Sequence, residues 1–350
     1  MRTPKTLATS LLALSAAALL ALSAAGAATA APAPGKAPTE TSGVTSHTVT
    51  ETGAADYWTE ERMRNAIPGD ILAGKAMQRA NNSKAALNRP VEAGAPSRIE
   101  AAGTSTAAGA AAAAPAAGAA PGLQAPDVQT RANASESPVP RIGKVFFTLG
   151  GANYVCSGNS VSAGNKSTVS TAGHCVNEGP GAFATKFTFV PAYLNGSAPY
   201  GKWTARALYA PTQWSSSGNM QYDTGFAVMS TLNGQYLSDV VGSSGLQFNA
   251  ARGLSYKAYG YPAAAPFNGE SLKSCSGTAT NDPYNPQFNS QGIPCNMTGG
   301  SSGGPWFIGT SSSGYQNSVN SYGYGSNSTT MYGPYWGSVI QSTYTSAAAS

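Results

Sequence analysis

Three short segments of this 350-residue chain contain the residue types that nucleophilic catalysis requires. The first, residues 171–175, reads TAGHC and follows a strand-like run. Its His174 is one of only two histidines, and the other, His47, lies far away in the sequence. A lone histidine is by default a structural or surface residue. The neighbouring Cys175 favours catalysis instead, because a bridge to Cys156 would close a short loop and hold His174 in one orientation, as a general base requires.

Residues 299–304, with the sequence GGSSGG, form the second segment. Glycines on both sides of a serine let the backbone turn sharply and bring amides close to a substrate carbonyl, as an oxyanion hole requires. Such runs also occur in linkers, but a linker would not continue into the apolar residues 305–308. The segment also matches the Gly-x-Ser-x-Gly turn of α/β-hydrolases, whose acid and histidine follow the serine. Residues 303–350 contain no Asp, Glu, His, Lys or Arg, which excludes that chain order.

The third segment is Asp223 at the head of the apolar run 224–229. A carboxylate that is buried there needs a partner. An imidazole Nδ1–H supplies one, and the acid then fixes the tautomer that leaves Nε2 free to accept a serine proton. Asp239 has moderately apolar neighbours, and Asp282 stands in a loop-like segment. We therefore favour Asp223 as the partner of the histidine.

The elements that position these residues are short strands. After residue 138 the sequence alternates strand-like runs with Gly, Asn, Ser and Pro, and no helical periodicity lasts for more than a turn or two. The runs are 144–148, 154–156, 168–170, 186–190 and 224–229. Residues 136–350 are enough for one large β domain or two small barrels that share an interface, so we predict an all-β fold.

The first thirty residues read as a secretory signal peptide. Arg2 and Lys5 precede an apolar stretch at 7–22, and residues 28–30 (ATA) offer a small-residue cleavage site. A membrane anchor is the alternative, but the apolar core is short and no basic stop-transfer flank follows it. We therefore expect a secreted, extracellular protein without a membrane segment after signal removal. In an oxidising compartment its four cysteines are expected to form disulfides.

Residues 31–135 have the composition of a pro-segment. They include an Ala/Gly/Pro-rich stretch at 101–126, which we expect to be a linker. One exception is a helix signal in which Thr59 precedes two glutamates. Two interpretations stay open here: an intramolecular pro-segment that docks on the following domain and restrains or assists it, or a local helix in a disordered leader. Cleavage at either Arg131 or Arg141 would release the leader.

The overall composition excludes several partners. Charged residues make up only 10% of the chain, the formal net charge is +5, and no basic run approaches a nucleic-acid patch. Two histidines and four cysteines without a Cys-x-x-Cys pair argue against zinc. We expect no metal, no cofactor and no nucleic acid, and we expect a monomer that acts on polypeptide substrates.

In the chain order His174, Asp223, Ser302, these segments resemble the motifs of chymotrypsin-family (trypsin-like) serine proteases. Residues 155–158 and 259–262 are similar to those of secreted bacterial members near the V8-like glutamyl endopeptidase branch. The resemblance covers about residues 142–340. It implies two antiparallel six-stranded β-barrels with the active site between them, in a protease domain spanning residues 136–350 that is secreted as a zymogen.

The resemblance also implies the role of each residue. Ser302 would attack the scissile carbonyl, His174 would act as base and then as acid, and Asp223 would orient the imidazole. The amides of Gly300 and Ser302 would hold the oxyanion, and the segment Ser321, Tyr322 and Gly323 resembles the strand that pairs with the substrate backbone. Two other functions stay open: a catalytically silent homologue that serves as an extracellular binding or adhesion module, and an esterase.

Departures from the family pattern bear on activation and specificity. The family commonly has Asp immediately before the nucleophile, where this chain has Ser301, so activity should not depend on an ion pair with the amine of Ile142. Six residues before the nucleophile stands Asn296, which does not support selection of Lys or Arg, and no histidine follows His174 to support glutamate preference. With Asn296 and Thr298, and Tyr322 nearby, we expect an apolar or uncharged residue at the cleaved bond.

The four cysteines permit three connectivities. We predict Cys156–Cys175 and Cys275–Cys295, one bridge in each half of the domain, with the second bracing the wall of the specificity pocket.

Overall fold

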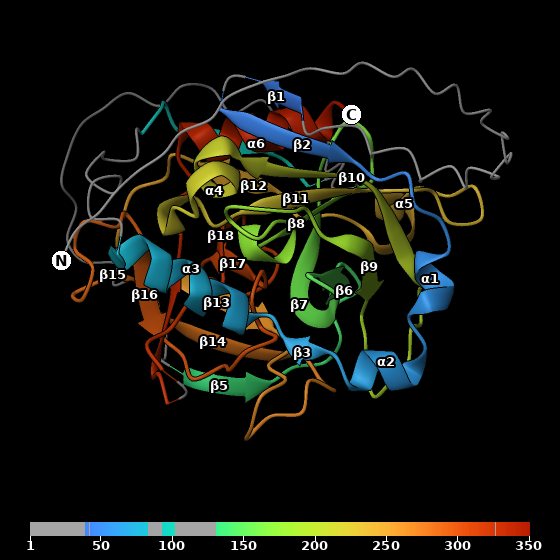
Figure 1. The fold of residues 1–350 in the computed structure, drawn as a ribbon. Helices are drawn as coiled ribbons and strands as arrows, with labels where there is room; N and C mark the ends of the chain where they lie inside the picture. Colours follow the sequence, from blue (N-terminus) through green and yellow to red (C-terminus); the bar gives the residue numbers. More distant parts are fainter. Residues whose placement is uncertain (1–38, 42, 83–92, 102–130, 326) are drawn as a thin grey trace, which may run out of the picture. The chain divides into compact units, whose positions relative to one another are not determined.

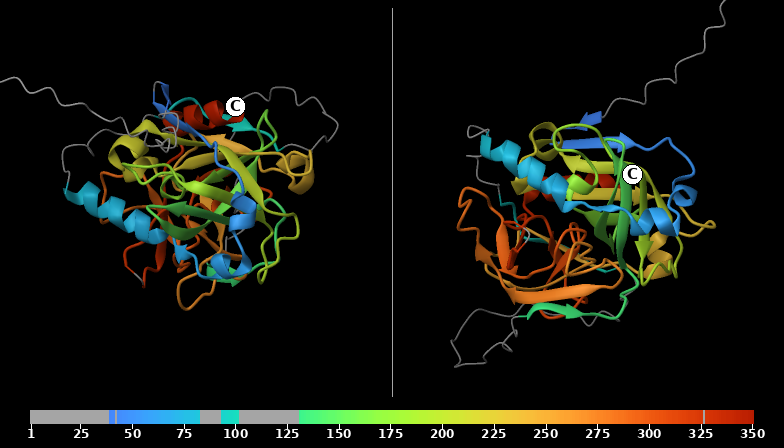
Figure 2. Two further views of the ribbon diagram at one scale, coloured as in Figure 1. Left: turned by 45° about the vertical axis from the view of Figure 1, so that its right-hand side comes forward. Right: turned by 60° about the horizontal axis from the view of Figure 1, so that its bottom comes forward.

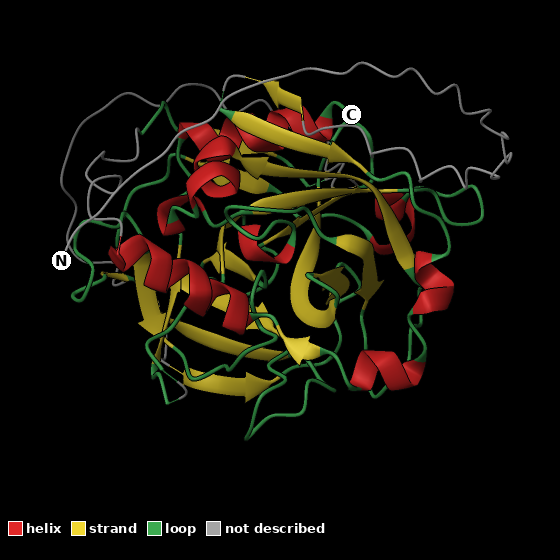
Figure 3. Cartoon of the chain, viewed as in Figure 1, coloured by secondary structure: helices red, strands yellow, loops and turns green. Residues whose placement is uncertain are grey.

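The computed structural model describes residues 39–41, 43–82, 93–101, 131–325 and 327–350. The expected signal peptide and nearly all of the expected linker lie outside these ranges. Strands dominate the described chain, with short helices around them (Figure 3). Within the described ranges, none of the helices combines the length and the apolar character needed to cross a bilayer.

The first half of the domain forms a closed antiparallel barrel of six strands. Its strands are β6 (Ile142–Leu149), β7 (Ala152–Val161), β8 (Thr168–Thr171), β9 (Thr185–Pro191), β10 (Trp203–Pro211) and β11 (Gly225–Met229). Neighbours follow the order β10-β11-β8-β7-β6-β9, and pairing between β9 and β10 completes the circle. Val145, Phe189 and Leu208 are fully buried in its core, as expected for strands rich in β-branched and aromatic residues.

The second half does not close into a barrel, so the prediction of two six-stranded barrels is correct only for the first. One sheet contains β12 (Leu246–Phe248), β13 (Ser255–Gly260), β14 (Lys273–Thr278), β17 (Pro305–Ile308) and β18 (Gln316–Val319). A separate sheet contains β15 (Thr280–Asn281), β16 (Gln291–Pro294) and β19 (Thr330–Gly333). The edge of β14 that faces away from β13 pairs with β5 (Arg131–Ser135). The bridge Cys275–Cys295 joins β14 to the residue after β16, where no ladder of hydrogen bonds joins these two strands.

Short helices complete the domain. They are η1 (Gly173–Cys175), α4 (Thr212–Ser217), η2 (Met220–Tyr222), α5 (Leu237–Val241) and the C-terminal α6 (Ser338–Ala348). Helix α6 packs on β10 and β11, and Tyr344 contacts the rings of Phe226 and Phe248. If the protein were a binding module, the Tyr-, Asn-, Gly- and Ser-rich residues 309–344 could offer stacking surfaces for sugars. Tyr332, Trp336 and Tyr344 are instead buried, so these side chains offer no exposed stacking surface.

Residues 39–101 contribute their own elements. They are β1 (Thr39–Thr41), β2 (Val44–Thr48), α1 (Ala54–Tyr57), α2 (Glu60–Arg64), β3 (Ile67–Pro68), α3 (Asp70–Asn82) and β4 (Ser97–Ile99). Thr59 caps α2, and its hydroxyl accepts the amide N–H of Arg62 at 3.2 Å, as the sequence predicts. We call residues 43–82 the N-terminal segment.

The N-terminal segment packs against the domain along its described length. Strand β2 extends the barrel sheet by pairing with β10 (Figure 1). Trp58 is fully buried, contacts the ring of Phe146 and donates its indole N–H to the carbonyl of Lys186 at 2.7 Å. Helix α3 lies between the barrel strands and the strands of the second half in both views of Figure 2. The described residues of this segment are therefore docked on the domain, as one of the two interpretations predicted, and do not form an isolated local helix.

Candidate active site

His174 and Asp223 form a fully buried pair. His174 lies in η1, and Asp223 follows η2 directly before β11. Nδ1 of His174 lies 2.8 Å from Oδ2 of Asp223, and the backbone N–H of His174 donates to Oδ1 at 2.8 Å. Because an ionised carboxylate can only accept, the proton on this ring lies on Nδ1. Nε2, which is left as the acceptor, is buried and has no hydrogen-bond partner among the described residues.

A disulfide and a serine hydroxyl hold this pair in place. The bridge Cys156–Cys175 links β7 to η1, directly beside His174. Ser321 Oγ donates to Asp223 Oδ2 at 2.5 Å. The adjacent Thr224 accepts a hydrogen bond from the indole N–H of Trp336 at 3.1 Å. The acid is thus fixed both from the barrel and from the second half.

The glycine-rich loop that carries Ser302 lies against the segment leading to His174. Gly303 has φ +80°, and a Cβ there would lie 2.1 Å from Oγ1 of Thr171, so only glycine fits. The carbonyl of Ser302 accepts the amide N–H of Ser157 at 2.7 Å, which ties the loop to β7. The amides of Gly300 and Ser302 have no acceptor among the described residues. Two free backbone donors beside a serine and an imidazole with a free Nε2 are the groups that acyl transfer needs.

The position before Ser302 is satisfied locally. Ser301 Oγ donates to the carbonyl of Thr298 at 2.7 Å. Ile142 is fully buried, and its amide donates to the carbonyl of Val139 at 2.9 Å. Position 301 is a serine and not an acid, so it offers no carboxylate partner for a free amine at Ile142.

The polar side chains expected to govern specificity form hydrogen bonds within the protein. Thr298 donates to the carbonyl of Ala264 at 2.6 Å, and Asn296 accepts from the side chain of Asn133 at 2.6 Å. The hydroxyl of Ser321 is bound to Asp223 rather than facing outward. None of these residues carries a charge with which to select a charged side chain.

Tyr322 and Gly323 continue the strand-like segment after Ser321. Backbone hydrogen bonds join Tyr322 to Tyr332 of β19, with N–O distances of 3.2 and 2.8 Å. The two rings stack, with centroids 5.1 Å apart. Gly323 is needed for close packing, because a Cβ there would lie 2.8 Å from Oγ of Ser328.

Asp282 is a buried residue near the site that sequence reasoning left in a loop. Its Oδ2 accepts the hydroxyls of Tyr322 at 2.8 Å and Tyr324 at 2.5 Å, and its Oδ1 accepts the amides of Tyr284 and Asn285. Burial and this carboxylate raise the pKa of Tyr322 well above its usual value. The Asp-Pro dipeptide signals a turn, but no local pattern indicates the tyrosine partners, which lie 40 residues or more away.

Asp70 of α3 is a second site neighbour that the sequence did not indicate. Its carboxylate abuts Gly299, where a Cβ would lie 2.0 Å from Oδ1 of Asp70. Burial raises the pKa of the Asp70 carboxyl. The positive charge of a protonated His174 would partly offset that rise. The sequence marks helix starts in this leader but not what they dock against.

One grouping of metal-ligand residue types occurs among the described residues, at Cys156, His174 and Cys175. Both sulfurs belong to the bridge Cys156–Cys175. Because a metal is bound by thiolates, these bonded sulfurs are unsuited as ligands.

The barrel, the serine loop and the histidine–aspartate pair define a chymotrypsin-fold serine protease architecture. No family model matches the chain. The crystal structure of protease Anisep from Arthrobacter nicotinovorans is 86% identical and covers 62% of this chain and 100% of its own, with a TM-score of 0.62. A thermostable serine protease, AL20, from an extremophilic microorganism is 50% identical and covers 61% of this chain and 98% of its own, with a TM-score of 0.59. The chain therefore belongs to the chymotrypsin-fold bacterial serine proteases.

Two more distant similarities add less. The structure of Glu endopeptidase is 21% identical with a TM-score of 0.50, and it shares the fold alone. The extracellular metalloprotease of Bacillus subtilis (strain 168) is 36% identical over 72 residues. This match spans 22% of that protein and 21% of this chain, about a fifth of each.

Proposed function

We propose that this protein is a secreted serine endopeptidase that hydrolyses peptide bonds through Ser302, His174 and Asp223. The observation that carries the proposal is the buried hydrogen bond of 2.8 Å between His174 Nδ1 and Asp223 Oδ2, which leaves Nε2 unprotonated and without a partner beside the serine loop. Membership among bacterial serine proteases supports the same conclusion.

In the proposed reaction, Ser302 Oγ attacks the scissile carbonyl while His174 Nε2 takes its proton. The negative charge that develops on the carbonyl oxygen is stabilised by the amides of Gly300 and Ser302, each such donor contributing about 10²–10³-fold in rate. The C–N bond then breaks as the imidazolium returns the proton to the leaving amine. Water, deprotonated by the same Nε2, hydrolyses the acyl-enzyme. Asp223 stabilises the imidazolium through Nδ1.

The domain boundaries follow the same proposal. Residues 1–30 serve as signal peptide, residues 31–135 as pro-segment and residues 136–350 as protease. The 62% of this chain that the Anisep structure covers is close to the share that residues 136–350 represent. For the residue preceding the cleaved bond we propose an apolar or uncharged side chain, because Asn296 and Thr298 are already hydrogen-bonded elsewhere.

A fluorophosphonate serine probe tests the nucleophile directly. We expect one adduct on the processed protein, located on Ser302 by mass spectrometry, and its loss in Ser302→Ala and His174→Ala. Ser301→Ala is the matched control, because its hydroxyl is bound to the Thr298 carbonyl and should not react. Peptide and ester substrates assayed in parallel separate a peptidase from an esterase. A processed, folded protein without an adduct would support the catalytically silent binding module instead.

A further inference from the structure

The N-terminal segment runs along the edge of the proposed active site. Strand β3 pairs in parallel with Tyr154 and Val155 of β7. The next residue, Gly69, donates its amide to the carbonyl of Val155 at 2.9 Å. A Cβ at Gly69 would lie 2.6 Å from Sγ of Cys156, whose bridge holds η1 and His174. The backbone of this segment is therefore packed directly against the disulfide that lies beside His174.

Asp70 then reaches the serine loop. Its carboxylate abuts Gly299, directly before the amide of Gly300 that would hold the oxyanion. When its ring is protonated, His174 is close enough to lower the pKa of the Asp70 carboxyl against the opposing effect of burial. With this segment in place, Ser302 is 4% exposed and His174 is fully buried.

The bound segment does not present a peptide bond for attack. The carbonyl of Gly69, which is the nearest to Asp70 on its N-terminal side, accepts the amide N–H of Leu72 at 2.9 Å. Helix α3 begins at Asp70, so the carbonyls that follow are directed along the helix. The amides of Gly300 and Ser302 have no acceptor in the described chain. A side chain, rather than a substrate carbonyl, therefore lies beside the reaction centre.

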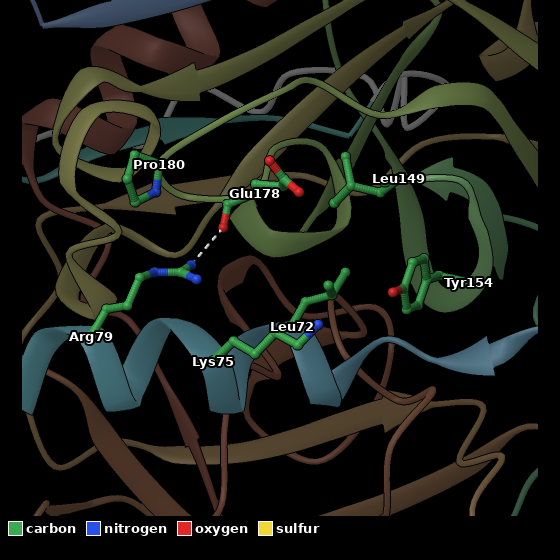
Figure 4. A pocket seen from close by; sticks show the side chains of 8 residues that line it. Leu72, Lys75, Arg79, Leu149, Tyr154, Glu178 and Pro180 are labelled. Carbon is green, nitrogen blue, oxygen red and sulfur yellow. Dashed lines mark hydrogen bonds between the residues drawn. The ribbon is translucent and has the colours of Figure 1, made fainter.

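Helix α3 is anchored beyond the site by both apolar and polar contacts. Leu72, Ala73 and Ala76 are buried against the domain. Arg79 donates to the carbonyls of Glu178 at 2.9 Å and Gly179 at 2.6 Å. Between helix and domain a pocket of about 280 Å³ remains (Figure 4), lined by Leu72, Lys75, Arg79, Leu149, Gly150, Tyr154, Glu178 and Pro180. One wall of this pocket is the helix itself, so removal of the segment would open it into a groove.

We propose that residues 67–79 are an intramolecular inhibitor that occupies the cleft in a form that the enzyme cannot cleave. The inference rests on the proposed function. It states which residues occupy the proposed active site before maturation. Inhibition follows from occupancy by the turn at Gly69 and Asp70 and by helix α3. It does not depend on an immature serine loop.

The test compares the two forms of the secreted full chain in one gel lane. A fluorescent fluorophosphonate should label the processed band, and it should label the unprocessed wild-type band at least about tenfold more slowly. Ala76→Asp places a charge in the buried face of α3 and should weaken its docking. Its unprocessed band should then label at a rate close to that of the processed enzyme. Gln78→Asp adds the same charge on the exposed side of α3 and should leave the unprocessed band unreactive.

Gly69→Ala provides a second variant should Ala76→Asp not be secreted, because its Cβ would collide with the disulfide rather than alter the helix. Equal labelling of both wild-type bands would overturn the inhibitor. Unprocessed bands that stay unreactive in both Ala76→Asp and Gly69→Ala would also overturn it, because the cause would then lie in the domain. Failure of the processed band to label would instead count against the proposed serine chemistry, so the two failures are distinct.

Discussion

Ser321 and His174 bind the same oxygen of Asp223, Oδ2, from opposite halves of the domain, at 2.5 and 2.8 Å. His174 belongs to the barrel half, whereas Ser321 begins the segment that continues to Tyr322 and β19. A shift between the halves would therefore change the hydrogen bonding of the acid. The orientation of the proposed base depends on contacts from both halves of the domain.

Asp223→Asn should leave the fold intact and lower kcat by about 10⁴-fold, the loss known for the chymotrypsin triad. The amide of asparagine would donate toward Nδ1 and favour the tautomer that protonates Nε2. Ser321→Ala removes one donor to the acid and should lower kcat by only about tenfold, about 1.4 kcal/mol. Steady-state kinetics on a peptide substrate measure both. Asp239→Asn is the control, because Asp239 forms an exposed ion pair with Lys166, and a comparable loss there would contradict the assignment.

Asp282→Asn should weaken substrate binding more than catalysis. The carboxylate accepts the hydroxyls of Tyr322 and Tyr324, so its loss releases the aromatic side chains that follow Ser321. We expect KM to rise several-fold for peptides long enough to contact the segment that follows Ser321. For a short ester substrate, kcat should stay within about twofold, since the reacting groups are unchanged. Hydrogen bonds to a charged group contribute about 1.5–3 kcal/mol each, so the melting temperature should also fall.

Tyr324→Phe is the conservative partner of that substitution, because it removes one of the two hydroxyls and leaves the charge in place. It should reproduce a smaller part of the rise in KM. A loss of kcat on both substrates without a change in KM would refute a positioning role for Asp282.

The sequence indicated candidate site residues where the adjacent residues carry the signal, and the structure brings two of these, His174 and Asp223, into contact. His174 stands beside a cysteine, Asp223 precedes a buried strand, and Ser302 lies among glycines, so each could be placed from a few adjacent residues. The structure contains the two expected bridges, Cys156–Cys175 and Cys275–Cys295. The open second half was not predicted, because the resemblance implies a second closed barrel, whereas no ladder of hydrogen bonds joins β14 to β16 in the structure.

Asp70 and Asp282 escaped prediction for a different reason. Asp282 acquires its role from Tyr322 and Tyr324, and Asp70 acquires its role from Gly299. These partners are distant in the chain, and a single sequence carries no signal for such contacts. Periodicity and capping identify a helix start, as at Thr59, but they do not identify the surface on which that helix docks.

Acidification should loosen strand β2 through His47. His47 stacks on Phe183 with ring centroids 5.4 Å apart, and burial lowers its pKa below 6.5 while Glu51 opposes the shift. The neutral ring is thus favoured when β2 is docked. Its contribution is present above pH 6.5 and is lost as the pH falls through the lowered pKa. Lys186 is the charged group facing this region from β9, and it pairs with Glu51 at 3.7 Å.

Hydrogen exchange of residues 44–49 in the unprocessed chain measures this effect between pH 8 and pH 5, after correction for the intrinsic pH dependence of exchange. We expect protection to fall as the pH decreases, and His47→Phe, which keeps the stacking ring, should abolish the decrease. A wild-type chain whose protection is independent of pH would argue against titration of His47.

Maturation should occur at Arg131 and not at Arg141. The carbonyl of Arg141 accepts the amide of Ser160 at 2.8 Å, and its guanidinium donates to Ser244 Oγ at 2.8 Å and to the carbonyl of Ser312 at 2.5 Å. Ile142, on the other side of that bond, is fully buried. Arg131 begins β5, which is the last strand at its edge of the sheet.

A protease needs an extended segment, and β5 is an extended strand at the edge of its sheet, so we expect the cut after Arg131. Intact mass and N-terminal sequencing should place the mature N-terminus at Ala132, so that residues 132–135 of β5 stay attached to the protease domain proposed for residues 136–350. Arg131→Gln should slow its appearance, whereas Arg141→Gln should leave the cut unchanged and lower stability through the lost contacts to Ser244 and Ser312. An N-terminus at Ile142 would require the start of β6 to open before cleavage. It would also contradict our expectation that activity does not depend on the Ile142 amine, because Ser301 is not an acid that could bind it.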